Sequence, residues 1–132
     1  MRPKFNHIAI KVSDAKNAVQ QLCSLGGIKA NETAYFAEVG MQIGFVLYNG
    51  ILIELLQAID SSCPITADSN GLHHIAFEME NIELFHAQIA HSQAVQVVQN
   101  IRKGREGRIF FFSMKANPKI WYECMEKHKK YE

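Results

Sequence analysis

The segment NHIAIKVSDAKNAVQQL (residues 6–22) is repeated in pattern by HHIAFEMENIELFHAQI (residues 73–89). When the two are superposed letter by letter, His7 falls on His74, and the apolar residues that follow fall on apolar residues. Self-similarity at a fixed spacing indicates repeated structural units. The sequence therefore predicts two copies of one module, and it singles out His74, rather than the adjacent His73, as the repeated histidine.

A second pair of segments strengthens the repeat. GILIELLQ (50–57) and KIWYECME (119–126) superpose with Glu54 on Glu123, at nearly the same offset as the first pair. Chance similarity between short apolar runs is common, whereas the recurrence of a histidine and a glutamate in the same order is not. We therefore take the duplication as the feature that organises the chain.

Each half begins with a strand followed by a helix. In HIAIKV (7–12), apolar side chains occupy alternate positions, which is typical of a half-buried strand. Asp14 or Ser13 is placed to cap the helix that follows, and the glycine pair at 26–27 ends it. In the second half, Asn81 takes the capping position.

Three further strands complete each half. We expect them near 34–39, 41–48 and 50–57, and again near 95–101, 107–114 and 119–126. Asn49-Gly50 and Asn117-Pro118 mark turns between them. The predicted fold class is α+β, with two tandem βαβββ modules forming a curved mixed sheet around a metal-binding cavity.

The domain organisation follows from this repeat. We predict a single domain over residues 1–132, with module one at about 5–58, a linker at about 59–71 and module two at about 72–127. The linker is polar, contains Pro64 and shows no periodicity.

Strand alternation decides which side chains share a face. His7 lies opposite the wholly apolar face of its strand, which we assign to the helix. For the strands that carry Glu54 and Glu123, the sequence leaves the choice of face open. If both glutamates share the face of His7 and His74, two imidazoles and two carboxylates converge in a trough. The predicted lining of that trough is Leu52, Leu56, Trp121 and Met125.

Two carboxylates among apolar residues are costly unless a positive charge compensates them. A divalent metal supplies that charge, and neutral imidazoles are its common partners. The predicted ligands are His7, Glu54, His74 and Glu123. This mixed nitrogen and oxygen set suits Ni, Co, Fe, Mn or Zn, and it differs from the four, often thiolate, ligands of a structural zinc site.

Composition narrows the class of partner. The 14 basic and 13 acidic residues nearly balance, which gives no electrostatic reason to expect nucleic acid or an acidic membrane. Three widely spaced cysteines favour a reducing compartment over a disulfide framework. We find no signal peptide and no apolar run long enough to span a bilayer, so we expect a cytoplasmic protein that acts on a small molecule.

These motifs resemble the vicinal oxygen chelate superfamily, which pairs two βαβββ modules around a metal. The resemblance runs from Phe5 to about Lys127, and its carriers are NHIAI, GILIELLQ, GLHHIAFEMENIE and IWYEC. GLHHIAFE is similar to methylmalonyl-CoA epimerases and to glyoxalase-like proteins near them. The resemblance implies a metal-dependent lyase or isomerase of the glyoxalase I type, which abstracts a proton next to a carbonyl and forms a metal-stabilised enolate.

The resemblance also implies roles for particular residues. Glu123 and Glu54 become candidates for the catalytic base, because glyoxalase I uses a glutamate at a metal position. Lys11 becomes a substrate-binding candidate, because glyoxalase I carries an arginine on its first strand, although Ala58 stands where that enzyme has an asparagine. Epimerases use a further carboxylate on the strand before the first metal glutamate, and residues 39–53 contain no acid.

Other activities in the same superfamily stay open. The first alternative is epimerase-like racemisation of an acyl thioester. Further alternatives are an extradiol-type dioxygenase, which holds iron by two histidines and one carboxylate, and a metal-free binding protein. We expect a homodimer. The basic segment IRKGREGR (101–108) is either a solvated hairpin or an anion site.

Overall fold

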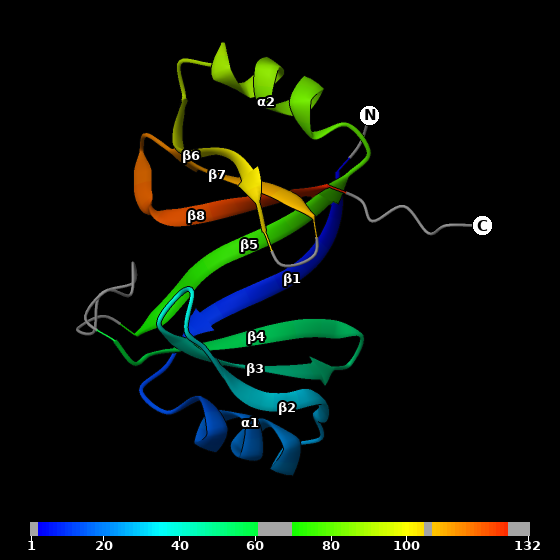
Figure 1. Cartoon of the computed structure of the whole chain (residues 1–132). Coiled ribbons are helices and arrows are strands. Elements are labelled where there is room, and N and C mark those ends of the chain that lie inside the picture. The colour runs from blue at the N-terminus through cyan, green and yellow to red at the C-terminus, as the bar shows by residue number, and fades with distance from the viewer. Residues whose placement is uncertain (1–2, 61–69, 105–106, 127–132) are drawn as a thin grey trace. The chain divides into compact units, whose positions relative to one another are not determined.

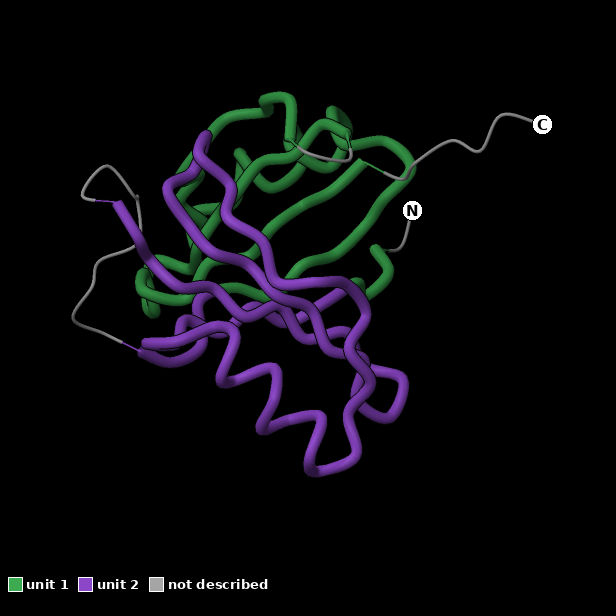
Figure 2. Tube along the Cα trace, turned by 60° about the horizontal axis from the view of Figure 1, so that its bottom comes forward, with its two compact units in different colours: residues 1–6, 74–132 green, residues 7–73 purple. Residues whose placement is uncertain are grey.

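The structure is a computed structural model, and it describes residues 3–60, 70–104 and 107–126. These residues form two compact units (Figure 2), one of residues 7–73 and one of residues 1–6 together with 74–132. We refer to them as the first unit (7–73) and the second unit (1–6 and 74–132). Most of the predicted linker lies outside the described residues.

The elements follow the predicted order in both units (Figure 1). The first set is β1 (Lys4–Lys11), α1 (Ala15–Ser24), β2 (Ile28–Phe36), β3 (Met41–Tyr48) and β4 (Ile51–Ala58). The second set is β5 (Gly71–Met79), α2 (Ile82–Ala90), β6 (Val95–Lys103), β7 (Arg108–Met114) and β8 (Asn117–Glu126). Two βαβββ modules are therefore confirmed.

Each module builds a mixed sheet. The strand order is β2-β3-β4-β1 in one and β5-β8-β7-β6 in the other. β1 pairs parallel with β4, and β5 pairs parallel with β8, while the remaining pairs are antiparallel. The first strand of each module thus lies beside its last strand, so residues about 45 positions apart in sequence become neighbours, as His7 does with Leu52.

Helix α1 begins and ends as its sequence predicts. Asp14 is the N-cap, and its side chain accepts a hydrogen bond from the Asn17 amide. At the other end, the amides of Gly26 and Gly27 donate to the carbonyls of Cys23 and Leu22. Gly26 adopts a φ of 108°, a left-handed conformation that favours glycine. The helix therefore ends in the six-to-one hydrogen-bond pattern of a Schellman motif.

Gly27 should be intolerant of any side chain. A Cβ there would lie 2.6 Å from Cγ1 of Val46 and 2.8 Å from the Leu22 carbonyl oxygen, which caps the helix. Gly27→Ala is expected to lower the free energy of unfolding by about 1–3 kcal/mol, because packed atoms must shift to admit the methyl group. Urea unfolding measures this loss, and a variant as stable as the wild type would show that the helix end is looser than described.

The predicted bounds of one strand and the predicted place of one turn need correction. β2 runs over Ile28–Phe36 rather than 34–39, because it is an edge strand with mostly exposed side chains and so lacks apolar alternation. The last turn lies at Lys115 and Ala116 rather than at Asn117-Pro118, since β8 already begins at Asn117. The Asn49-Gly50 turn is confirmed, with φ values of 51° and 86° as a type I′ hairpin requires.

The helices cover one face of each sheet. α1 contributes Val19 to a cluster with Val46 and Leu55, and Ile10 and Val12 pack against it. In the second unit, Ile82 of α2 packs with Met79, Phe110, Phe112 and Cys124. The side chains on the opposite face of each sheet are therefore the ones free to build a site.

Candidate functional site

The first unit holds a buried His–Glu pair. On β1, burial alternates so that His7, Ala9 and Lys11 are the buried residues, and Ala9 lies opposite Glu54 of β4. The Nε2 atom of His7 is 3.4 Å from Oε1 of Glu54. Both side chains project from the sheet face that α1 does not cover, because Ile10 and Val12 occupy the helix-packed face.

The second unit repeats the arrangement. Ala76 of β5 lies opposite Glu123 of β8, as Ala9 lies opposite Glu54. The Nε2 atom of His74 is 4.0 Å from Oε1 of Glu123. Tyr122 and Cys124, the chain neighbours of Glu123, belong to the helix-packed core instead. The choice of face that the sequence left open is thus settled for each glutamate within its own unit.

An aromatic ring accompanies each pair. Phe45 of β3 lies opposite Glu54, and its ring centroid is 6.4 Å from that of His7 in an edge-to-face contact. Phe111 of β7 lies opposite Glu123, and its ring centroid is 5.5 Å from that of His74, also edge to face. Each of the two units therefore carries a histidine, a phenylalanine and a glutamate in the same arrangement.

The donor atoms and the burial of the His–Glu pairs bear on metal binding. Glu54 is 9% exposed, and its neighbours on β1 and β4 are mostly apolar. A neutral imidazole does not neutralise a carboxylate, so burial of the carboxylate is costly without a further positive charge. Imidazole nitrogens and carboxylate oxygens are the donors that divalent transition metals accept. Each pair therefore supplies one nitrogen and one oxygen donor of the kinds that bind a metal.

The predicted lining residues lie on the same faces as the pairs. Leu52 is opposite His7 and Leu56 is opposite Lys11. In the second unit, Trp121 is opposite His74, and Met125 is opposite Glu78. In each unit, these residues therefore lie on the face of the sheet that carries the His–Glu pair.

A further acidic residue, which the motifs did not indicate, lies in the turn between β2 and β3. Glu38 is exposed, and the turn around it is held by hydrogen bonds from the Val39 amide to the Phe36 carbonyl and from the Gly40 amide to the Ala37 carbonyl. Phe36 and Val39 pack against a cluster that contains Ala9 and Leu56. The turn is thus anchored on the face that carries His7 and Glu54.

Glu38 lies just outside residues 39–53, the segment in which an epimerase-like carboxylate was expected. β3 begins at Met41, and Glu38 belongs to the turn that leads into it rather than to the strand itself. Gly40, with a φ of 63°, ends the turn and could have marked it as a structured connection.

The cysteines do not contribute ligands within the described residues. Cys124 is buried on the helix-packed face, where desolvation and the charge of Glu123 raise the pKa of its thiol to about 12. Cys23 belongs to α1, where it packs against the cluster of Val19, Val46 and Leu55, and like Cys124 it is a free thiol. Cys63 lies outside the described residues.

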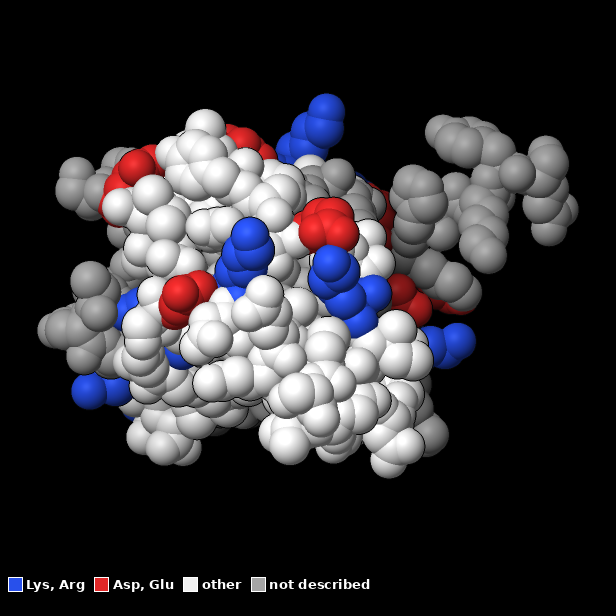
Figure 3. Space-filling model, turned by 90° about the horizontal axis from the view of Figure 1, so that it is seen from below, with Lys and Arg blue, Asp and Glu red and all other residues white. Residues whose placement is uncertain are grey.

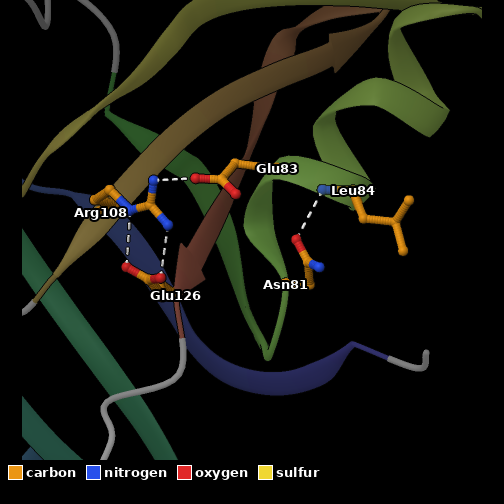
Figure 4. A network of polar contacts seen from close by, with 5 residues as sticks. All are labelled: Asn81, Glu83, Leu84, Arg108 and Glu126. Atoms are coloured by element: carbon orange, nitrogen blue, oxygen red, sulfur yellow. Dashed lines mark hydrogen bonds and ion pairs between the residues drawn. The ribbon is translucent and has the colours of Figure 1, made fainter.

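The basic segment 101–108 is tied into the protein at its last residue. Arg108 donates to both carboxylate oxygens of Glu126, at 3.0 and 2.8 Å, and also pairs with Glu83 at the start of α2 (Figure 4). These carboxylates raise the pKa of the Arg108 guanidinium. Its charge is therefore already compensated, which favours the hairpin interpretation over an anion site.

Surface charge gives no sign of a polyanionic partner on the face that can be inspected. The face drawn in Figure 3 shows Lys and Arg side chains next to Asp and Glu side chains, scattered among uncharged residues. No helix among the described residues combines the length and the hydropathy that crossing a bilayer requires.

With this geometry in place, the family can be stated. The chain belongs to the Glyoxalase/Bleomycin resistance protein/Dioxygenase superfamily, whose model matches residues 6–112. This is the vicinal oxygen chelate superfamily that the motifs predicted.

Among its relatives are methylmalonyl-CoA epimerases. The human mitochondrial enzyme is 25% identical over 114 residues, which is 83% of this chain and 65% of that protein. The chain thus spans slightly less than two thirds of the human relative. A crystal structure of the Mycobacterium tuberculosis methylmalonyl-CoA epimerase has a TM-score of 0.77, with 21% identity, over 96% of this chain and 89% of that one.

The same fold occurs in a hypothetical protein from Bacillus halodurans C-125. Its TM-score is 0.82 at 24% identity, and the match covers 100% of this chain and 99% of that one. The α+β class with two βαβββ modules, predicted from the repeat, is therefore also the fold of solved relatives.

Proposed function

We propose that this protein racemises the carbon next to the thioester carbonyl of a carboxylated acyl-CoA, of which methylmalonyl-CoA is the simplest branched example. The observation that carries the proposal is the buried His–Glu pair, which recurs at corresponding strand positions in both units. The similarity to methylmalonyl-CoA epimerases supports racemisation as the reaction of such a site.

The two pairs are proposed to act as one metal site. His7, Glu54, His74 and Glu123 would together hold a single divalent ion, as the predicted ligand set requires. When bound, the ion supplies a positive charge beside the thioester oxygen and so stabilises negative charge that develops there. Its identity among Ni, Co, Fe, Mn and Zn is a matter for elemental analysis.

Proton transfer is the work of carboxylates in this proposal. One carboxylate removes the proton from the substrate carbon, and the electrons of the broken C–H bond delocalise toward the thioester oxygen. A proton delivered to the opposite side of that carbon inverts its configuration. We assign the two positions to Glu38 and Glu123. Glu38 supplies the carboxylate that β3 lacks, and Glu123 would leave the metal, or bind it weakly, when the substrate arrives. Glu54 is the alternative to Glu123.

The apolar lining has a supporting role. Leu52, Leu56, Trp121 and Met125 exclude water from the reacting carbon, and exclusion of water strengthens every charge interaction at the site. Trp121 contacts Phe111 at a ring-centroid distance of 5.4 Å, which links the lining to the aromatic partner of His74.

Glyoxalase-type isomerisation is the second candidate. It involves the same kind of proton transfer and occurs in the same superfamily. The glutamate in each pair is also a candidate base for that reaction. The named epimerases among the relatives support racemisation better. Cytoplasmic location stays a prediction, because the human relative is a mitochondrial enzyme. The homodimer also stays a prediction.

Deuterium exchange tests the proposed function. Metal-loaded protein is incubated in D₂O with methylmalonyl-CoA, and the label at the substrate carbon is followed by mass spectrometry. Label should enter at a rate proportional to protein concentration, and a single epimer should become a mixture. The hemithioacetal of methylglyoxal and glutathione, supplied in parallel, should not be converted. Conversion of the hemithioacetal without labelling of methylmalonyl-CoA would favour the glyoxalase reaction and contradict racemisation.

A further inference from the structure

Lys11 is a buried lysine whose ammonium group makes no hydrogen bond to any residue that the structure describes. Only 4% of the surface of Lys11 is exposed, and its Nζ atom is buried. Lysine is almost never fully buried unless it is paired. The position is therefore unusual, and neither the core nor the His–Glu pair explains it.

Packing alone does not require a lysine here. Lys11 lies opposite Leu56 on the sheet face that α1 leaves uncovered, and an apolar side chain would fill the same place without a charge to desolvate. A buried ammonium group without a protein anion is stabilised when a ligand brings the anion. Among the residues that the structure describes, no carboxylate is hydrogen-bonded to the Lys11 ammonium, so a ligand anion is a suitable partner for it.

The place of Lys11 on the strand shows which part of a ligand would bring that anion. Lys11 shares its face with His7 and Ala9, and Ala9 lies opposite Glu54. Successive side chains on one strand face are about 6.6 Å apart, so Lys11 lies one such step from Ala9, the residue opposite Glu54, and two steps from His7. The phosphates of a CoA ester are separated from the thioester by the long pantetheine arm, so they do not reach this position when the thioester is at the pair.

We propose that Lys11 binds the free carboxylate of the substrate's acyl group and so makes the protein select carboxylated acyl thioesters over plain ones. The inference rests on the proposed function, because it takes the substrate to be an acyl-CoA. It adds the feature that distinguishes one acyl-CoA from another. An ammonium–carboxylate contact away from water supplies a charge-assisted hydrogen bond, which a neutral acyl group does not form.

The test measures binding rather than turnover. Isothermal titration of metal-loaded protein compares methylmalonyl-CoA with propionyl-CoA, which lacks only the carboxylate. For Lys11→Met, we expect methylmalonyl-CoA to bind about 10- to 100-fold more weakly, the usual loss for a hydrogen bond to a charged group, with propionyl-CoA changed less than about 3-fold. Lys16→Met, which removes an exposed lysine of α1, should change neither affinity.

Each outcome bears on the proposal separately from the reaction. If wild-type protein shows the preference and Lys11→Met abolishes it, the proposal holds even where no deuterium exchange is found. Equal loss of both ligands, or no preference in the wild type, would overturn it even where exchange occurs. A thermal melt provides the folding control, because Lys11→Met should melt no lower than the wild type when the buried charge is removed.

Discussion

His74→Ala is expected to abolish metal binding and to slow racemisation by at least about 100-fold, because loss of a ligand costs no less than the 10- to 100-fold that loss of a ligand's supporting partner costs. His74 faces away from α2, next to Phe111 and Glu123. Its neighbour His73 points to the other face of β5, as strand alternation requires. His73→Ala should therefore keep metal content and activity near those of the wild type.

The comparison of these adjacent histidines is a stringent one. Both variants remove an imidazole from the same strand, so a general loss of β5 stability would affect both. Elemental analysis and the deuterium-exchange rate, measured on each, separate the two cases. If His73→Ala lost the metal and His74→Ala kept it, the repeat that selected His74 would have been read in the wrong register.

Glu38→Gln is expected to lower kcat by about 10²- to 10⁴-fold, the usual contribution of a positioned general acid or base. Glutamine keeps the shape of the side chain but accepts no proton at neutral pH. Because Glu38 lies in the β2–β3 turn and not in the His–Glu pairs, the metal content should not change. Steady-state kinetics with elemental analysis of the same sample measures both.

A matched control is available on the neighbouring strand. Glu32 is an exposed acid of β2 whose carboxylate pairs with Lys29 at 2.8 Å. Glu32→Gln removes one negative charge from the same region and should leave kcat within about twofold, as is usual for surface changes away from a site. Equal loss in the two variants would indicate an effect of net charge rather than of a base at Glu38.

Duplication made much of the fold predictable. The superposition of His7 on His74 and of Glu54 on Glu123 identified both His–Glu pairs before any geometry was known. Alternation on β1 placed His7 on the face away from the helix, because the apolar residues of that strand form an unbroken series. Capping by Asp14 was equally local and so equally readable.

What the sequence did not reveal depends on tertiary neighbours. The register of β3 against β4 brings Phe45 opposite Glu54, and no spacing within either strand encodes that pairing. β2 was misplaced because an exposed edge strand has no apolar face to show. The burial of Lys11 likewise depends on the residues packed around it, whereas a lysine in a strand normally predicts an exposed position.

Metal stoichiometry tests most directly the central claim that the two pairs form one site. Protein purified without chelators is analysed for metal and for chain concentration, as wild type, as His7→Ala and as His74→Ala. We predict one divalent ion per chain in the wild type and loss of that ion in each variant, because each unit supplies half of the ligands. Two ions per chain in the wild type, with one retained in each variant, would show two independent sites and contradict the account.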